Sequence, residues 1–320
     1  MLAALDAAAR IVYTTMTPTV QQRWPLLDAR CGTAVWVKHE NHTPIGAFKV
    51  RGGLVYFDDL CRARTPPGVV AATRGNHGQS VAFAASRYGI PVAVVVPHGN
   101  SRSKNRAMQA LGAELIERGD DFQASYEAAT EIAAERGWHM MPSFHSLLVR
   151  GVASYSLELL RQVPDLQVLY VPIGQGSGIC GAIGARDALG LRTSIVGVVS
   201  SAAPAYARSW DAGRAVECVV STRLADGMAC RVPDTDALVT IRRGAERIVE
   251  VTDDEVEAAM WVIYEDTHNV AEGAGAAGLA ALLQERDRLR GRSAGVVLSG
   301  ANVDREVFAG VLARSSERVR

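Results

Sequence analysis

The stretch VPIGQGSGICGA, residues 171–182, begins at the end of the apolar run LQVLYVP and carries glycines at positions 174, 176, 178 and 181. Glycine readily adopts φ angles above 0°, so successive backbone N–H groups of this loop can point at one anion. A helix that starts in the loop adds the positive end of its dipole. The stretch therefore predicts a buried strand, a phosphate-binding turn and a helix, a repeating unit of α/β folds.

The same unit recurs on both sides of this loop. The runs GVVAA and IPVAVVVP precede it, TSIVGVVS and SAGVVLSG follow it, and each leads into a helical segment. Strands that are apolar on both faces and separated by helices are typical of parallel sheets covered on both sides. Two local signals support helices: Phe122, Tyr126, Ala129 and Ala133 recur at helical spacing, and TDDE at 252–255 fits a capping box. The sequence predicts an α/β fold.

Composition excludes several classes of protein. The 320 residues include 34 Lys+Arg and 34 Asp+Glu, so no net charge attracts nucleic acid or an acidic membrane. The content of 48% hydrophobic residues and 30 glycines is typical of a globular enzyme. No apolar stretch approaches the roughly 18–20 residues that span a bilayer.

The cysteines and the N-terminal segment bear on location. The five cysteines are odd in number and form no C-x-x-C pair, which argues against disulfides or a zinc site: Cys31, Cys61, Cys180, Cys218 and Cys230. The first ten residues, MLAALDAAAR, are too short for a secretion signal and carry an acid where a basic residue is expected. We therefore expect a reducing, cytoplasmic location.

The kind of phosphate ligand is a separate question. The segment GSGICG, residues 176–181, satisfies the dinucleotide pattern G-x-G-x-x-G. That pattern also requires an acid about 20 residues later, for the ribose hydroxyl. Here Val199, Ser200 and Ser201 occupy that neighbourhood. A smaller phosphate-bearing cofactor is favoured, and an NAD-dependent oxidoreductase stays a remote alternative.

Three further segments complete a possible site. TRGNHGQS (73–80) and LSGANVD (298–304) each follow an apolar run, where open α/β sheets place ligand-binding loops. Taken singly, their Thr, Asn and Ser residues could simply cap helices or turns. ENHTPIGAFKVRGG (40–53) places Lys49 beside Phe48 between glycines, as a surface charge or as a buried amine kept for covalent chemistry.

In this order the four segments resemble the pyridoxal-phosphate enzymes of fold type II, the tryptophan synthase β-like family, over essentially the whole chain. The nearest branch is the threonine/serine dehydratases and serine racemase. The family pattern S-F-K-x-R-G-A matches residues 47–53, G-N-H matches 75–77, the glycine loop matches 174–178, and S-G-x-N matches 299–302. Ala47 replaces the usual serine, and Gln175 and Ser177 replace two loop glycines.

The resemblance implies two open, mostly parallel twisted sheets flanked by helices, with pyridoxal 5'-phosphate between two domains. We expect residues 1–52 and 147–320 to form the large domain and residues 53–146 the small one. The resemblance also assigns cofactor contacts: Lys49 for the covalent bond, Phe48 beside the ring, Asn76 at its 3-hydroxyl, Ser299 at its nitrogen, and Gly174, Gln175, Gly176, Ser177 and Gly178 at the phosphate.

By the same resemblance, the enzyme removes the β-hydroxyl of a threonine- or serine-like amino acid and releases a 2-oxo acid and ammonia. Lys49 is then also the base, because burial lowers the pKa of a lysine amine. The substrate carboxylate would bind the loop formed by Thr73, Arg74, Gly75, Asn76 and His77. A racemase or a β-replacement synthase on the same scaffold is the alternative, and a non-catalytic cofactor carrier is a weaker one.

Two departures narrow the prediction. Racemases of this group carry a serine, their second base, where this chain has Arg74, and a guanidinium stays protonated at neutral pH. Arg74 would either turn outward into solvent or pair with a substrate carboxylate. Val199 stands where the racemase-like branch has a metal-binding acid, so no metal is expected there. Only residues 305–320 follow the last motif, so we expect no regulatory domain and a catabolic or detoxifying role. We also expect a homodimer.

Overall fold

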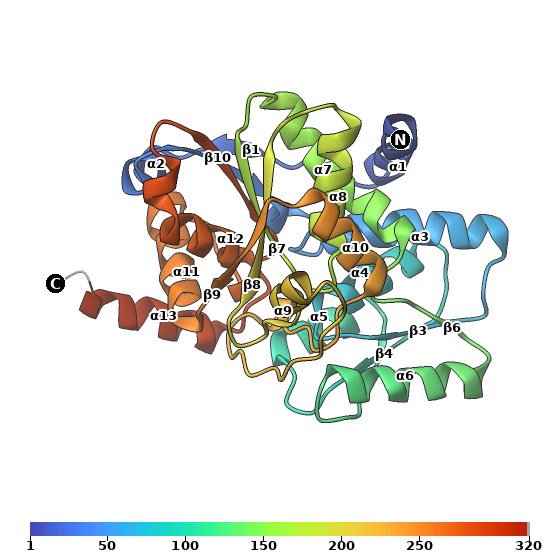
Figure 1. Ribbon diagram of the computed structural model, residues 1–320. Coiled ribbons are helices and arrows are strands. Elements are labelled where there is room, and N and C mark those ends of the chain that lie inside the picture. The colour runs from blue at the N-terminus through green and yellow to red at the C-terminus, as the bar shows by residue number, and fades with distance from the viewer. Residues whose placement is uncertain (319–320) are drawn as a thin grey trace.

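The computed structural model describes residues 1–318 and contains a six-stranded and a four-stranded sheet (Figure 1). The larger sheet has the order β1 (Gln21–Arg23), β2 (Ala34–His39), β10 (Ser293–Leu298), β7 (Val168–Pro172), β8 (Ser194–Ser200) and β9 (Arg247–Val251). Strand β1 pairs antiparallel with β2, and every other neighbouring pair is parallel. The smaller sheet is wholly parallel: β5 (Glu114–Glu117), β4 (Val92–Val96), β3 (Val69–Ala72) and β6 (His139–Met140). The predicted class, α/β with two mostly parallel sheets, is confirmed.

Helices separate the strands, as the alternation in the sequence predicts. Their bounds are α1 (Leu2–Tyr13), α2 (Pro25–Cys31), α3 (Lys49–Ala63), α4 (Asn76–Ser86), α5 (Arg102–Ala110), α6 (Phe122–Arg136), α7 (Ser146–Gln162), α8 (Ser177–Ala188), α9 (Ala205–Ala212), α10 (Thr235–Gly244), α11 (Asp253–Thr267), α12 (Gly273–Gln284) and α13 (Arg305–Arg318). Short 3-10 turns lie at η1 (Glu40–His42), η2 (Asp226–Met228) and η3 (Arg286–Leu289). The capping box at Thr252 and Glu255 opens α11 as predicted.

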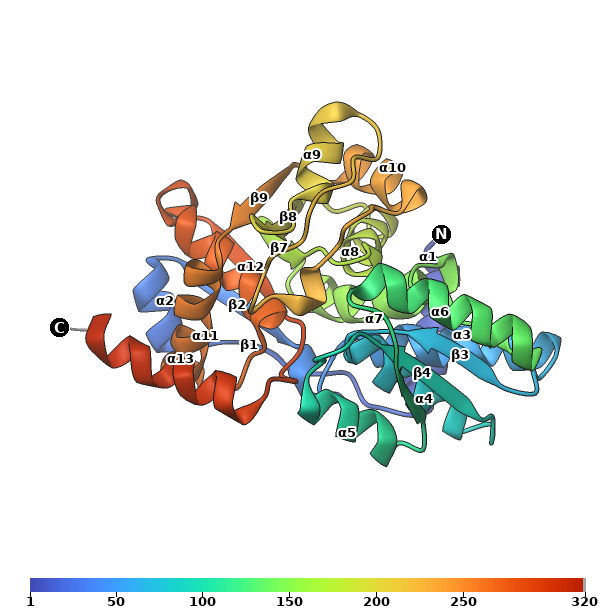
Figure 2. The same ribbon diagram turned by 90° about the horizontal axis from the view of Figure 1, so that it is seen from below.

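Both faces of each sheet are covered, which explains the continuous apolar strands. In β7, Val168 and Tyr170 pack in the core formed with α2, α11 and α12, whereas Leu169 and Val171 face α7, α8 and α10. Figure 2 shows these two groups of helices on opposite sides of the large sheet. The smaller sheet lies between α3 and α4 on one face and α6 on the other. Alternate residues of a strand point to opposite faces, so both sets must be apolar.

The strands of the smaller sheet all lie between β2 and β7 in the chain, so the two sheets are interleaved in sequence. The predicted boundary at 52/53 falls inside α3, and the one at 146/147 falls at the start of α7. The exact domain limits therefore stay a proposal. Within residues 1–318, no helix combines the length and the apolar character needed to cross a membrane.

A buried charge network fixes α3, the helix that begins at Lys49. The Arg51 side chain is fully buried, and its Nε donates to Glu40 Oε2 at 2.6 Å. Its Nη1 donates to Glu158 Oε1 at 2.6 Å, and Lys38 forms an ion pair with the same carboxylate. Two cations therefore face two carboxylates, which compensates the cost of burying each charge.

Candidate functional site

The lysine segment and the loop after β10 are joined by backbone hydrogen bonds. Phe48 N donates to Ser299 O at 3.0 Å, and Ala301 N donates to Gly46 O at 2.9 Å. These bonds hold the start of α3 against the carboxyl end of β10. Lys49, the first residue of α3, thereby lies beside the carboxyl end of β10 and shares a cavity with the loops that follow β3 in the smaller sheet and β7 in the larger one.

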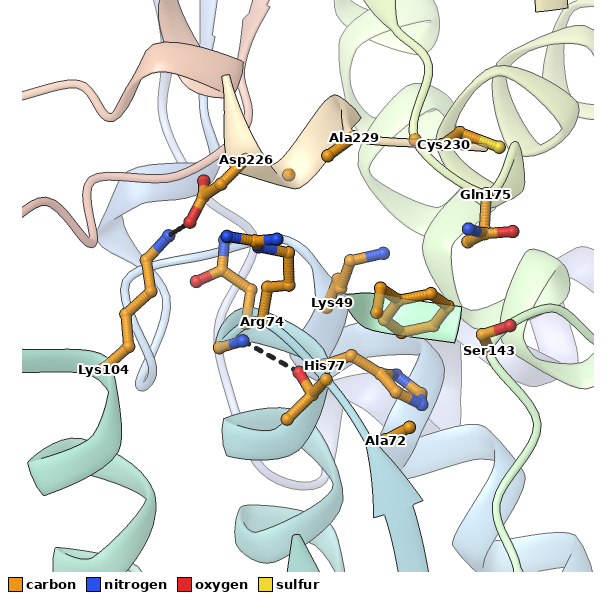
Figure 3. Close-up of a pocket in the computed structure, with 16 residues that line it drawn as sticks. Lys49, Ala72, Arg74, His77, Lys104, Ser143, Gln175, Asp226, Ala229 and Cys230 are labelled. Atoms are coloured by element: carbon orange, nitrogen blue, oxygen red, sulfur yellow. Dashed lines mark hydrogen bonds and ion pairs between the residues drawn. The ribbon is translucent and has the colours of Figure 1, made fainter. Parts of the chain in front are cut away.

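The predicted site residues line two adjoining cavities, of which Figure 3 shows the outer one. The nine predicted cofactor contacts line the inner cavity: Phe48, Lys49, Asn76, Gly174, Gln175, Gly176, Ser177, Gly178 and Ser299. The five residues predicted to bind substrate line the outer one: Thr73, Arg74, Gly75, Asn76 and His77. Lys49 and Asn76 line both cavities, so the structure brings together all the residues predicted to contact cofactor or substrate.

Lys49 differs from the other two lysines of the chain. Lys38 is paired with Glu158, and Lys104 with two carboxylates. Among the described side chains none forms an ion pair with Lys49, and its Nζ lies over the Phe48 ring, 5.0 Å from the centroid. Burial lowers the pKa of Lys49 to about 8, although the carboxylate of Glu272 acts in the opposite direction. A buried amine with this pKa is suited to nucleophilic and base chemistry near neutral pH.

The glycine loop forms a cradle that side chains would fill. A Cβ on Gly174 would lie 2.3 Å from Gly227 O, and Gly176 has a φ of 101°. Tyr206 Oη donates to Gln175 O at 3.0 Å, which fixes the loop. Helix α8 begins at Ser177, and the first N–H groups of a helix have no acceptor within it. These N–H groups and the glycine backbone fit a phosphate.

The loop after β3 is built around one hydroxyl. Thr73 Oγ1 accepts from Gly75 N at 2.8 Å and from Gly78 N at 3.0 Å. Gly75 has a φ of 147°, and a Cβ there would lie 2.3 Å from the Lys104 side chain, so this position requires glycine. The N–H groups of Asn76 and His77, at the start of α4, are left for a ligand.

Asn76 has a fixed orientation. Its Nδ2 donates to Glu272 Oε1 at 2.5 Å, and its Oδ1 accepts from Asn302 Nδ2 at 2.9 Å. One Nδ2 hydrogen is left for the cavity, as a hydroxyl or phenolate of a cofactor requires. Ser299, only 6% exposed, donates from Oγ to Ala274 O at 3.4 Å, and its neutral side chain lines the same cavity as Lys49.

His77 is a neutral residue in this environment. Burial, together with the nearby Lys49, lowers the pKa of His77 to about 3, although a hydrogen bond to the Pro142 backbone acts in the opposite direction. Its Nε2 is buried and has no hydrogen-bond partner. A neutral imidazole that donates from Nδ1 can accept a hydrogen bond at Nε2. His77 therefore offers an acceptor and no positive charge.

Three charged residues at the cavity were not found from the sequence. Lys104 Nζ lies 2.7 Å from Asp226 Oδ2 and 3.0 Å from Glu272 Oε2. Burial opposes the charge of Lys104, but the two carboxylates outweigh it and raise its pKa. Burial raises the pKa of Glu272 despite Lys104. A single acid within the apolar run NVAEGAGAAGLAALL was a usable signal for Glu272, whereas Lys104 and Asp226 had none.

Comparison with known proteins supports one family. Residues 12–300 match the family model described as pyridoxal-phosphate dependent enzyme. L-threonine ammonia-lyase of Thermotoga maritima is 34% identical over 94% of this chain and 75% of its own length. L-threo-3-hydroxyaspartate ammonia-lyase of Saccharomyces cerevisiae is 30% identical over 95% of this chain and 94% of its own. The structure of maize serine racemase superimposes with a TM-score of 0.90 at 26% identity, over 99% of this chain and 98% of that one.

Proposed function

Because the chain belongs to the family of pyridoxal-phosphate dependent enzymes, we propose that it removes the β-hydroxyl of a β-hydroxy-α-amino acid and releases a 2-oxo acid and ammonia. The observation that carries this proposal is Lys49, an unpaired buried amine with a lowered pKa between the two ligand-binding loops. Similarity to an L-threonine ammonia-lyase over most of the chain supports the same reaction. Similarity to a serine racemase structure keeps racemisation as the alternative.

In this proposal the cofactor supplies an aldehyde for Lys49 and an electron-withdrawing ring. Phe48 would pack beside the ring, Asn76 would donate to its 3-hydroxyl and Ser299 would meet its nitrogen. The phosphate would bind the N–H groups of residues 174–178, where a Cβ on Gly174 would leave no room. The Lys49 amine takes the α-proton of the substrate. The neutral Ser299 hydroxyl favours loss of the β-hydroxyl over transamination, because it does not hold the ring nitrogen protonated.

The position of Arg74 ranks elimination above racemisation. Arg74 precedes Gly75 in the substrate loop, where a second base would be needed on the face opposite Lys49. A guanidinium does not accept a proton at neutral pH, so a two-base racemisation lacks one of its groups. We also propose a cytoplasmic location, which the five free cysteines support, and a homodimer, which the family resemblance supports.

The pKa of Lys49 predicts how cofactor uptake depends on pH. Only the unprotonated amine attacks an aldehyde, and a pKa lowered to about 8 makes that form available at a lower pH. We expect the rate at which the apoprotein takes up pyridoxal phosphate to rise with pH and level off above about 8. An ordinary lysine would keep gaining rate up to about pH 10. Stopped-flow absorbance measures the rate of cofactor uptake, with Nα-acetyl-lysine, whose ε-amine is free, as the control.

A substrate panel tests the proposed reaction. We expect at least one of L-threonine, L-serine, phenylserine and 3-hydroxyaspartate to yield a 2-oxo acid and ammonia in equal amounts. The same panel in EDTA should give unchanged rates, because Val199 is a buried apolar side chain where a metal-binding acid would be needed. Formation of D-amino acid faster than oxo acid would instead identify a racemase.

A further inference from the structure

Arg74 points into the substrate cavity without a partner. It lines both the outer cavity, to which the loop after β3 contributes, and a wider opening beyond that cavity, called the outer opening below. In Figure 3 its side chain is directed toward the side of the cavity where Asp226 and Lys49 lie. Its Nε is buried and has no hydrogen-bond partner. A buried guanidinium N–H without an acceptor loses its hydration and gains nothing in return, so the cavity is built to receive an acceptor there.

The acids of the cavity do not serve Arg74. Asp226 and Glu272 both bind Lys104, and the other oxygen of Glu272 accepts from Asn76. Among the side chains that the structure describes, none forms an ion pair with Arg74. Its buried Nε therefore stays without an acceptor until a ligand brings one.

The acids of the outer opening are also largely engaged. Asp121 and Glu217 pair with Arg231, and Asp234 caps α10 through Ala237 N. Asp120 lines the same opening and completes its set of carboxylates. None of these carboxylates lies within the 4.0 Å of an ion pair with Arg74. Arg74 therefore forms no ion pair with the carboxylates of this opening.

The α-carboxylate of the substrate has its own place. Thr73 Oγ1 occupies the N–H groups of Gly75 and Gly78, which leaves those of Asn76 and His77 at the start of α4. A carboxylate at a helix N-terminus gains both hydrogen bonds and the helix dipole. Arg74 is therefore an additional anion-binding group, beyond what an amino acid with a neutral side chain uses.

We propose that Arg74 selects a substrate with a second carboxylate, so that the enzyme acts on β-hydroxy dicarboxylic amino acids. This inference rests on the proposed elimination and names its substrate class. The planar guanidinium donates two parallel hydrogen bonds to a side-chain carboxylate, a geometry that a hydroxyl or methyl group cannot match. Threonine and serine would leave the buried Nε of Arg74 without an acceptor.

Binding of two isosteric amino acids tests the inference without turnover by elimination. L-Aspartate and L-asparagine lack the β-hydroxyl and differ mainly by one charge. With the holoenzyme, calorimetry should give a Kd for L-aspartate about 10- to 100-fold lower than for L-asparagine. In Arg74→Ala this ratio should fall to about 1, and Arg74→Lys should retain part of it. Equal Kd values in the unmodified enzyme overturn the inference, as does an equal loss for both ligands in Arg74→Ala.

Turnover kinetics provide a second, independent test of this selectivity. We expect kcat/KM for 3-hydroxyaspartate to exceed that for L-serine by at least tenfold, and Arg74→Ala to lower that ratio by about 10- to 100-fold. Arg118→Ala is the control, because it removes an exposed arginine that pairs with Glu131 and is not among the residues that line the cavity or the wider opening. If L-threonine or L-serine is the better substrate, the inference fails while the proposed elimination stands. If no β-hydroxy amino acid yields an oxo acid but aspartate still binds preferentially, the elimination fails and the selectivity stands.

Discussion

Lys49→Ala is expected to lower kcat by about 10⁴-fold or more, because the substitution removes the nucleophile and the base together. In the structure the side chain lines both cavities and has no ion pair that its loss would disrupt. We therefore expect the variant to fold and to keep its thermal unfolding midpoint within a few degrees. The measurement is oxo-acid release under saturating substrate, with circular dichroism as the folding control.

Covalent trapping makes this prediction residue-specific. The chain has three lysines, so borohydride reduction of the holoenzyme should add the cofactor mass to the peptide that contains Lys49. Peptides with Lys38 and Lys104 should stay unmodified, because both amines are buried in ion pairs. Lys49→Ala should show no added mass at all. Near-native turnover by this variant, or cofactor mass on another lysine, would contradict the assignment.

Much of the site could be predicted because it is encoded in short local patterns. Each of the loops around Gly75, Gly176 and Ser299 directly follows an apolar strand, and open parallel sheets place their ligand-binding loops at the carboxyl ends of strands, here in both sheets. Glycines at 75 and 176 have φ angles that other residues rarely adopt, so the sequence marks these turns directly. The fold class was predicted from these patterns, the family and its cofactor were predicted from the resemblance of the four segments, and all three are confirmed. The roles of the individual residues stay predictions.

The charged pairs could not be predicted, because their partners are far apart in the chain. Lys104 meets Asp226 and Glu272 across more than 120 positions, and no local pattern links a lysine in an amphipathic helix to acids at the start of a 3-10 turn or of a distant helix. Arg51 was visible as part of a motif, but its partner Glu158 lies in α7 on an ordinary helical face. Such contacts depend on how the two sheets pack, which periodicity does not describe.

Arg51→Met is expected to lower the free energy of unfolding by about 3–5 kcal/mol, because it leaves a buried carboxylate without its cation. The loss does not fall equally on the two acids. Glu158 keeps its ion pair with Lys38, whereas Glu40 keeps only the hydroxyl of Thr19 as a side-chain partner. Urea unfolding measures the change. Arg118→Met is the control: it breaks an exposed pair with Glu131 and should cost less than about 1 kcal/mol.

The asymmetry between the two acids gives a sharper test. If the cost of Arg51→Met arises from the uncompensated Glu40, then Glu40→Gln added to that variant should restore part of the lost stability, although each substitution alone destabilises. Glu158→Gln added instead should not, because it leaves Lys38 without its carboxylate. Additive losses in both double variants would show that packing of the Arg51 side chain, and not its charge, holds α3 in place. Because Lys49 opens that helix, the rescued variant should also bind pyridoxal phosphate more tightly than Arg51→Met alone.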